Sequence, residues 1–199
     1  MNENLNIRTL DLAFESLSIR LHENDAPPLE IVVCGGSALI LEGVVSRTTT
    51  DVDILALMLD GSLCSPDPLP ESLRQAASEV AEDLDLSRDW LNNGPSRGEG
   101  GLFQMGLPDG IALRLHSRSY SPALIVHFVH RIDQVHFKLY ASVDRGGYHI
   151  EDLLALAPSS SELEAAARWT MTHDVSRGFA MMLADLLRQL GHEDVADRL

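Results

Sequence analysis

The chain contains Val32-Val33-Cys34-Gly35-Gly36-Ser37, followed by Arg47-Thr48-Thr49-Thr50-Asp51-Val52-Asp53. The two valines lead into a glycine turn, and the aliphatic run 52–57 that follows Asp51 is typical of a β-strand. Because side chains alternate along a strand, Asp51 and Asp53 are expected on the same face, about 6–7 Å apart. Two such carboxylates suit Mg²⁺, which prefers carboxylate, water and phosphate oxygens. The sequence therefore predicts a metal site at Asp51 and Asp53.

The order of strand, Gly-Gly-Ser turn, helix and Asp-x-Asp strand resembles the polymerase-beta-like nucleotidyltransferase superfamily. The resemblance implies that Gly35, Gly36 and Ser37 bind a nucleoside triphosphate. It also implies that Asp51 and Asp53 are catalytic and hold Mg²⁺ or Mn²⁺. The alternatives are an ordinary strand–helix turn and two solvated carboxylates at the start of a strand. The turn is neither a dinucleotide fingerprint nor a P-loop, because it lacks a third glycine and a following Gly-Lys-Ser/Thr.

A second resemblance lies in Phe137-Lys138-Leu139-Tyr140 and the later His149-Ile150-Glu151-Asp152-Leu153. These segments are similar to the carboxy-terminal helices of the abortive-infection and toxin–antitoxin branch of that superfamily. The resemblance implies that Lys138 binds the triphosphate and that Asp152 is the acidic residue downstream of it. The alternatives are a lysine that extends its stem along an apolar helix face to reach water, and a helix-surface carboxylate.

The superfamily usually has a third carboxylate on a later strand, and this chain departs from that pattern. The expected strands around 111–116 and 123–129 contain no acidic residue. Arg114 or His116 is predicted to stand in that place, close to the acidic pair if the strands are neighbours. A positively charged side chain there would compete with a second metal ion. One tightly bound Mg²⁺ is therefore expected instead of two.

The composition narrows the classes of partner. The chain has 199 residues, 30 acidic and 15 basic residues, and a net charge of −15. This balance disfavours binding to extended nucleic acid or to an anionic membrane, both of which depend on clustered Lys and Arg. No apolar run approaches the roughly 20 residues of a membrane span, and the two cysteines suggest no disulfide framework, so a cytoplasmic protein is expected.

The pattern along the chain predicts a nucleotidyltransferase-like α/β (α+β) fold, a mixed sheet flanked by helices, with a helical carboxy-terminal subdomain. We expect the α/β domain over 1–130 and the helical subdomain over 131–199. Within the first domain, 61–70 is predicted to be a loop. Segments 102–107 and 111–116 are predicted to be two strands joined by Pro108-Asp109-Gly110, which is a hairpin signal.

Two functions follow from these observations. The first is an Mg²⁺-dependent nucleotidyltransferase that moves a nucleoside monophosphate from a nucleoside triphosphate to an acceptor. That acceptor is a tRNA end, a protein hydroxyl or a small molecule, and the sequence does not choose among them. The second is a catalytically inactive nucleotidyltransferase-like module that binds a nucleotide or a protein partner in a toxin–antitoxin or defence system.

Overall fold

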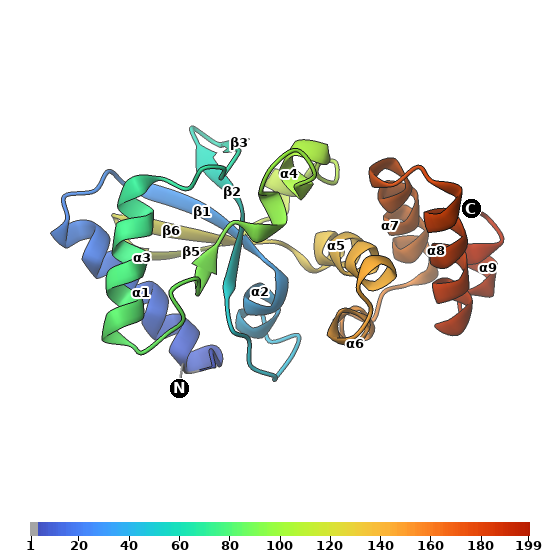
Figure 1. Ribbon diagram of the computed structural model, residues 1–199, viewed down its shortest axis with the longest axis horizontal. Coiled ribbons are helices and arrows are strands. Elements are labelled where there is room, and N and C mark those ends of the chain that lie inside the picture. Colours follow the sequence, from blue (N-terminus) through green and yellow to red (C-terminus); the bar gives the residue numbers. More distant parts are fainter. Residues whose placement is uncertain (1–3) are drawn as a thin grey trace. The chain divides into compact units, whose positions relative to one another are not determined.

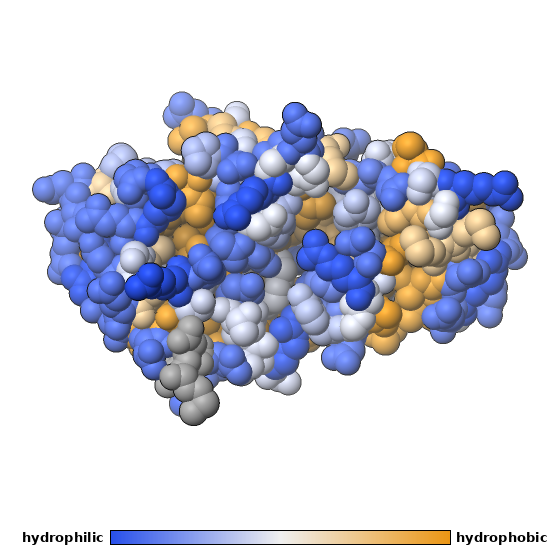
Figure 2. All heavy atoms as spheres, viewed as in Figure 1, coloured by the Kyte–Doolittle hydropathy of each residue, from blue (hydrophilic) through white to orange (hydrophobic). Residues whose placement is uncertain are grey.

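The computed structural model describes residues 4–199, which form two compact units (Figure 1). The first unit ends at His130 and the second begins at Arg131. The described fold is a mixed α/β structure, in agreement with the predicted fold class. Among the described residues, no helix is both long and apolar enough to cross a membrane. Hydrophilic residues cover much of the face seen in Figure 2.

The first unit is built on a six-stranded mixed sheet. Its strands are β1 (Leu29–Cys34), β2 (Val52–Leu59), β3 (Ser62–Cys64), β4 (Leu91–Asn92), β5 (His116–Ser121) and β6 (Leu124–Phe128). The order is β3-β2-β1-β6-β5, and β4 pairs with β2 beside this path. Neighbours in this order pair antiparallel, except for the parallel pair β1 and β6, and β4 also runs parallel to β2.

The helical segments of the first unit connect these strands. They are α1 (Ile7–Glu23), α2 (Gly35–Leu41), α3 (Glu71–Asp83), η1 (Gly94–Ser96), α4 (Leu102–Met105) and η2 (Ile111–Leu113). Helix α1 begins where the Asn6 side chain accepts hydrogen bonds from the backbone N–H groups of Arg8 and Thr9. Its apolar stripe, which includes Phe14 and Leu17, is buried.

One face of the sheet packs against α1 and α3, which lie side by side on it (Figure 1). Val33, Ile54 and Val126 point into this core, and Phe14 meets Trp90 edge to face at 6.5 Å. Because strand residues alternate, the residues between these apolar ones are directed to the opposite face. That second face carries Asp53, and it is where the candidate site lies.

The sequence prediction of two strands before residue 117 is wrong. Residues 102–105 form α4, residues 111–113 form a 3₁₀ turn, and the strand begins only at His116. Gly106 and Gly110 adopt positive φ angles of 111° and 72°, which extended strands do not contain. Ile111 and Leu113 do not share a buried strand face, since Ile111 is buried and Leu113 is 92% exposed.

The predicted loop at 61–70 also contains a short strand, β3. Asp60 and Gly61 both have positive φ, 50° and 75°, as a two-residue type I′ hairpin turn requires. The Asp-Gly dipeptide after an aliphatic strand is a signal for this hairpin, so the prediction of a loop over all of 61–70 is wrong at 62–64.

The second unit is entirely helical in the described residues. Its helices are α5 (Arg131–Asp144), α6 (Tyr148–Ala155), α7 (Ser160–His173), α8 (Arg177–Gln189) and α9 (Glu193–Ala196). Helix α5 contacts α6, α7 and α8. Trp169 on α7 packs against Phe137 and Tyr140 of α5, with ring centroids 5.6 and 6.3 Å away.

Candidate functional site

The glycine turn joins β1 to α2 and lies beside the acidic strand. Antiparallel pairing of β1 with β2 sets Cys34 directly opposite Asp53. Gly35 follows Cys34 with φ of +73°, a conformation that residues with a Cβ rarely adopt. A Cβ at Gly35 would lie 2.7 Å from Asp53 Oδ2, so only glycine leaves room for that carboxylate. The backbone of the turn and the Asp53 carboxylate are therefore in direct proximity.

Asp51 and Asp53 flank a core residue at the start of β2. Val52 between them is fully buried, and both aspartates are partly exposed. Asp51 immediately precedes the strand, and its Oδ1 accepts a hydrogen bond of 3.2 Å from Thr49 Oγ1. Burial of Val52 fixes the register of this segment, since a slip by one residue would bring the aspartates into the core.

Two further side chains of the segment before β2 reach the turn. A Cβ at Gly36 would lie 2.9 Å from Arg47 Nη2 and 3.2 Å from Thr49 Oγ1. The backbone of Thr49 is held by two hydrogen bonds to Leu5, at 2.7 and 2.9 Å. The glycine turn thus has a carboxylate beside Gly35 and a guanidinium beside Gly36.

Ser37 is placed differently from the two glycines. Its side chain is buried, with the residue only 1% exposed, and its Oγ donates a hydrogen bond of 3.4 Å to the Cys34 carbonyl. The hydroxyl therefore stabilises the turn through a hydrogen bond to the backbone that precedes it. Its predicted contact with a nucleotide stays a prediction.

The neighbour of Asp53 on the other edge of β2 is Asn92. Strand β4 is parallel to β2 and pairs Asn92 with Asp53. Paired residues of neighbouring strands point to the same face, so the carboxamide lies on the face of the carboxylate. Asn92 Oδ1 accepts a hydrogen bond of 2.7 Å from the Gly94 backbone N–H. No sequence pattern marks Asn92 as a site residue, because a two-residue strand leaves no periodic pattern.

The prediction that a strand 111–116 adjoins the acidic strand and places His116 beside the acidic pair is wrong. His116 begins β5, and β1 and β6 lie between β5 and β2. Arg114 precedes β5, and its position beside the acidic pair stays a prediction. The His116 ring nitrogen Nδ1 lies 3.0 Å from Glu42 Oε2, and Arg114 Nη2 donates to the Asp109 carbonyl at 2.7 Å. Within residues 4–199, no three His, Cys, Asp or Glu side chains gather in a group that could hold a metal ion.

Lys138 lies in the second unit, on α5. Its Nζ is 2.8 Å from Asp152 Oδ2 on α6, and the two side chains are 5% and 1% exposed. The Tyr148 ring lies 5.8 Å from the same ammonium. The structure thus brings Lys138 together with Asp152, and the alternative of a solvated lysine is wrong. A role for Lys138 in binding a triphosphate stays a prediction.

A comparison with family models agrees with this geometry. The model described as "Nucleotidyltransferase of unknown function (DUF6036)" matches residues 8–65. The match supports a nucleotidyltransferase-like family. It extends from α1 to β3 and includes both the glycine turn and the acidic pair. No curated protein and no solved structure matched the chain.

Proposed function

We propose that the protein transfers a nucleoside monophosphate from a nucleoside triphosphate to an acceptor hydroxyl. Asp51 and Asp53 would bind Mg²⁺ or Mn²⁺, and the backbone at Gly35 and Gly36, with the Ser37 hydroxyl, would meet the phosphates. The observation that carries the proposal is the 2.7 Å between Asp53 Oδ2 and the Cβ position of Gly35. A divalent cation on that carboxylate would be adjacent to phosphates held by the turn.

The residues present fit a magnesium ion. Mg²⁺ usually keeps several waters and takes one or two protein carboxylates together with substrate phosphates. Asp51 and Asp53 are partly exposed and can supply those carboxylates, and glycine at position 35 lets Asp53 Oδ2 approach the backbone of the turn. When bound, the ion neutralises the charge that develops on the attacking and leaving oxygens.

Basic side chains have a separate task in this proposal. A triphosphate carries several negative charges, and the chain has only 15 lysines and arginines. Arg47 beside Gly36 would bind phosphate oxygens through its planar group of N–H donors. Lys138 would neutralise the outer phosphates, as the resemblance of its helix to the toxin–antitoxin branch implies.

The net charge favours some acceptors over others. A net charge of −15 repels a polyanion, so a protein hydroxyl or a small molecule such as an aminoglycoside is favoured over an extended RNA. A short contact with a tRNA end is compatible with the same charge.

The second candidate is a catalytically inactive module that binds a nucleotide or a protein partner in a toxin–antitoxin or defence system. Asn92 favours it, because a neutral amide stands opposite Asp53 where a third carboxylate would complete a two-metal site. A module that binds a nucleotide would still bind Mg²⁺ with it but would not transfer label.

Thermal unfolding with each of the four nucleoside triphosphates and Mg²⁺ tests the proposal. A ligand that binds only the native state raises the melting temperature, and Asp51→Asn and Asp53→Asn should each abolish that rise. Asp60→Asn is the matched control, because Asp60 lies in the β2–β3 turn and asparagine tolerates its φ of 50°.

Transfer of label from α-labelled triphosphates in cell lysate then separates the active enzyme from the inactive module. Label on a protein or small molecule, lost in Asp53→Asn, supports the enzyme. Absence of any melting shift at millimolar concentration of all four triphosphates would refute nucleotide binding in both forms.

A further inference from the structure

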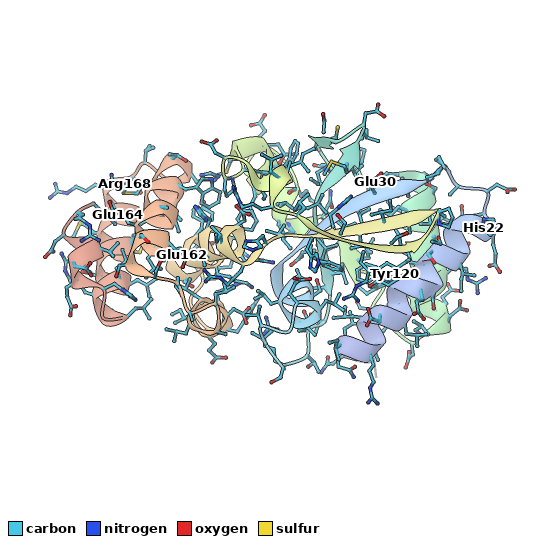
Figure 3. The ribbon with its side chains drawn as sticks, turned by 180° about the vertical axis from the view of Figure 1, so that it is seen from behind. His22, Glu30, Tyr120, Glu162, Glu164 and Arg168 are labelled. Carbon is cyan, nitrogen blue, oxygen red and sulfur yellow. The ribbon has the colours of Figure 1, made fainter. Side chains whose placement is uncertain are left out.

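A chain of three polar side chains crosses β5, β6 and β1. The Ser117 hydroxyl on β5 lies 2.7 Å from Nδ1 of His127 on β6. The other ring nitrogen, Nε2, lies 2.9 Å from Oε2 of Glu30 on β1, which is labelled in Figure 3. All three residues belong to the first unit, and none of them is used in the proposed nucleotide transfer.

The sheet register puts the three side chains on one face. Ser117 pairs directly with His127, and Glu30 pairs with Ile125, two residues before the histidine. Val126 and Phe128 point into the core, so Ile125 and His127 point to the opposite face. The arrangement is therefore fixed by strand pairing rather than by flexible loops.

The exposure of the three residues differs in a useful way. The His127 side chain is 10% exposed, the Glu30 side chain is 42% exposed, and Ser117 is exposed. A buried imidazole held at both nitrogens has a fixed ring orientation. The hydroxyl at its end can still be reached by a molecule from solution.

The chemistry of the carboxylate decides the tautomer of the ring. An ionised glutamate only accepts hydrogen bonds, so the neutral histidine donates from Nε2 to Glu30. Nδ1 is then unprotonated and accepts the hydrogen bond from the Ser117 hydroxyl. Ser117, His127 and Glu30 thus stand in the order of a nucleophile, a base and an acid that orients the base. In the serine-protease template the nucleophile meets Nε2 and the acid meets Nδ1, and here the two ring nitrogens are exchanged.

We propose that Ser117 is an activated nucleophile that accepts acyl groups from esters, with His127 as its base and Glu30 as the positioning residue. The serine oxygen bonds to the ester carbonyl carbon, and its proton passes to His127 Nδ1. The bond to the leaving alkoxide breaks, and the alkoxide takes that proton. A water molecule, deprotonated by the same nitrogen, then releases the carboxylic acid and restores the serine.

Backbone N–H groups of β5 would supply the hydrogen bonds to the charge of the tetrahedral intermediate. Strand β5 ends the described strand order, and alternate N–H groups of an edge strand point away from its neighbour. Backbone N–H groups of this kind are the usual donors to an oxyanion. The substrate class is a small ester that can lie along this edge.

Ser119 offers a matched control within the same strand. It lies two residues after Ser117, it is also exposed, and it pairs with Ile125 instead of a histidine. Its hydroxyl donates a hydrogen bond of 3.4 Å to the Ser121 carbonyl. The two serines differ chiefly in the base that stands next to one of them.

Diisopropyl fluorophosphate is the test reagent, applied to the full chain without nucleotide and read by peptide mass mapping. The serine oxygen bonds to phosphorus, fluoride leaves, and the proton passes through His127 to solvent. We expect Ser117 to be labelled and Ser119 to remain unlabelled. His127→Gln should slow labelling about a hundredfold and Glu30→Gln about tenfold or more, whereas Ser119→Ala should change nothing.

The rate of 4-nitrophenyl acetate hydrolysis should fall in the same variants, most in His127→Gln, less in Glu30→Gln and not at all in Ser119→Ala. His127 is buried, so His127→Gln can fail to fold. Glu30 is partly exposed, so Glu30→Gln should fold and still test the proposal. Each variant is compared at an unchanged urea midpoint, so that slow labelling reports chemistry and not unfolding. Equal labelling of the two serines, or labelling unaffected by Glu30→Gln, would overturn the proposal, and neither result bears on nucleotide transfer.

Discussion

Gly35 carries two constraints at once, a left-handed backbone and the approach of the Asp53 carboxylate. Its φ is +73°, and Gly43 has nearly the same value, +72°, with no atom within 4 Å of its Cβ position. The pair of residues therefore separates backbone strain from loss of space. Only the loss of space should affect the candidate site.

Gly35→Ala and Gly43→Ala are predicted to share a stability loss of about 1–2 kcal/mol from the left-handed conformation. Gly35→Ala should lose more, because the new methyl displaces Asp53, and it should also lose the Mg²⁺-triphosphate melting shift. Urea unfolding and thermal shift measure the two effects. Equal loss of the melting shift in Gly43→Ala would mean that the turn does not act through Asp53.

Asn92 is the second residue whose chemistry can be tested alone. Asn92→Asp would place a third carboxylate opposite Asp53 while keeping an oxygen to accept the hydrogen bond from Gly94. We expect Mg²⁺ affinity to rise about tenfold, the scale on which changes around metal ligands act. Label transfer should increase with it.

Asn92→Ala controls for loss of the amide without adding charge. It removes the hydrogen bond to the Gly94 N–H and should not tighten Mg²⁺ binding. If Asn92→Asp binds Mg²⁺ no better than Asn92→Ala, then the side chain at position 92 does not face the ion that Asp53 holds.

At the scale of elements, the sequence predicts the long amphipathic helices better than the strands. The stripe of Leu10, Phe14 and Leu17 identifies α1, because burial on one face imposes a helical period. Strand β5 lacks such a pattern, since it is a polar edge strand with Ser117, Ser119 and Ser121. The aliphatic segment 111–113 before it predicts a strand by its alternation but forms a 3₁₀ turn.

The candidate site shows the same division. Asp51, Asp53 and the glycines could be proposed from sequence because they are adjacent to strong strand and turn signals. Asn92 could not, because its position depends on pairing between β2 and a two-residue strand far along the chain. The family resemblance singles out Lys138 and Asp152 but does not predict that they form an ion pair, because that pair depends on the packing of α6 against α5.

The buried pair between α5 and α6 should be costly to break. Removing one partner of a buried ion pair leaves an uncompensated charge, so Lys138→Met alone should cost about 3–5 kcal/mol. Lys138→Met combined with Asp152→Leu should recover much of that loss, because two apolar residues can replace a buried pair. Urea unfolding of the single and double variants measures this difference.

The same double variant tests the phosphate role of Lys138 without a large stability change. If Lys138 binds the outer phosphates, the double variant should bind a triphosphate more weakly and a monophosphate almost unchanged. Equal affinity of wild type and double variant for the triphosphate would assign Lys138 to stability alone.

Helix α7 begins with a capping box whose strength depends on pH. Burial raises the pKa of Glu162, but hydrogen bonds from Ser159 and the Arg131 guanidinium outweigh it, so the pKa lies below its ordinary value of 4.5. A lowered pKa in the folded state gives stability that is full above pH 4.5 and is lost as the pH falls through the folded value.

Glu162→Gln keeps an oxygen acceptor and removes the titration. Its stability deficit relative to wild type should therefore be largest at neutral pH and shrink in acid. Ser159→Ala should cost about 1 kcal/mol at neutral pH, the usual cost of losing a helix N-cap. Urea unfolding at neutral and acid pH measures both, and a Glu162→Gln deficit that grows in acid would contradict the assignment.

At the scale of the whole molecule, charge is the dominant feature. Acidic residues outnumber basic ones by 30 to 15, so the folded chain repels itself electrostatically. Among the described residues, several ion pairs join exposed side chains, such as Arg188 with Asp197 at 3.0 Å, and exposed pairs contribute little stability. Screening by salt should therefore weaken the repulsion among the acidic residues more than it weakens the attraction within the ion pairs.

We expect the melting temperature to rise as NaCl increases from low concentration to about 0.1 M, where the screening length is about 10 Å. MgCl₂ at matched ionic strength should raise it further in wild type, because a cation held between Asp51 and Asp53 stabilises the native state by mass action. That additional rise should be absent in Asp53→Asn, while the NaCl response stays the same. A melting temperature that falls with NaCl would show that ion pairs outweigh net repulsion. An equal MgCl₂ response in wild type and Asp53→Asn would show that Mg²⁺ acts only on the general excess of acidic charge.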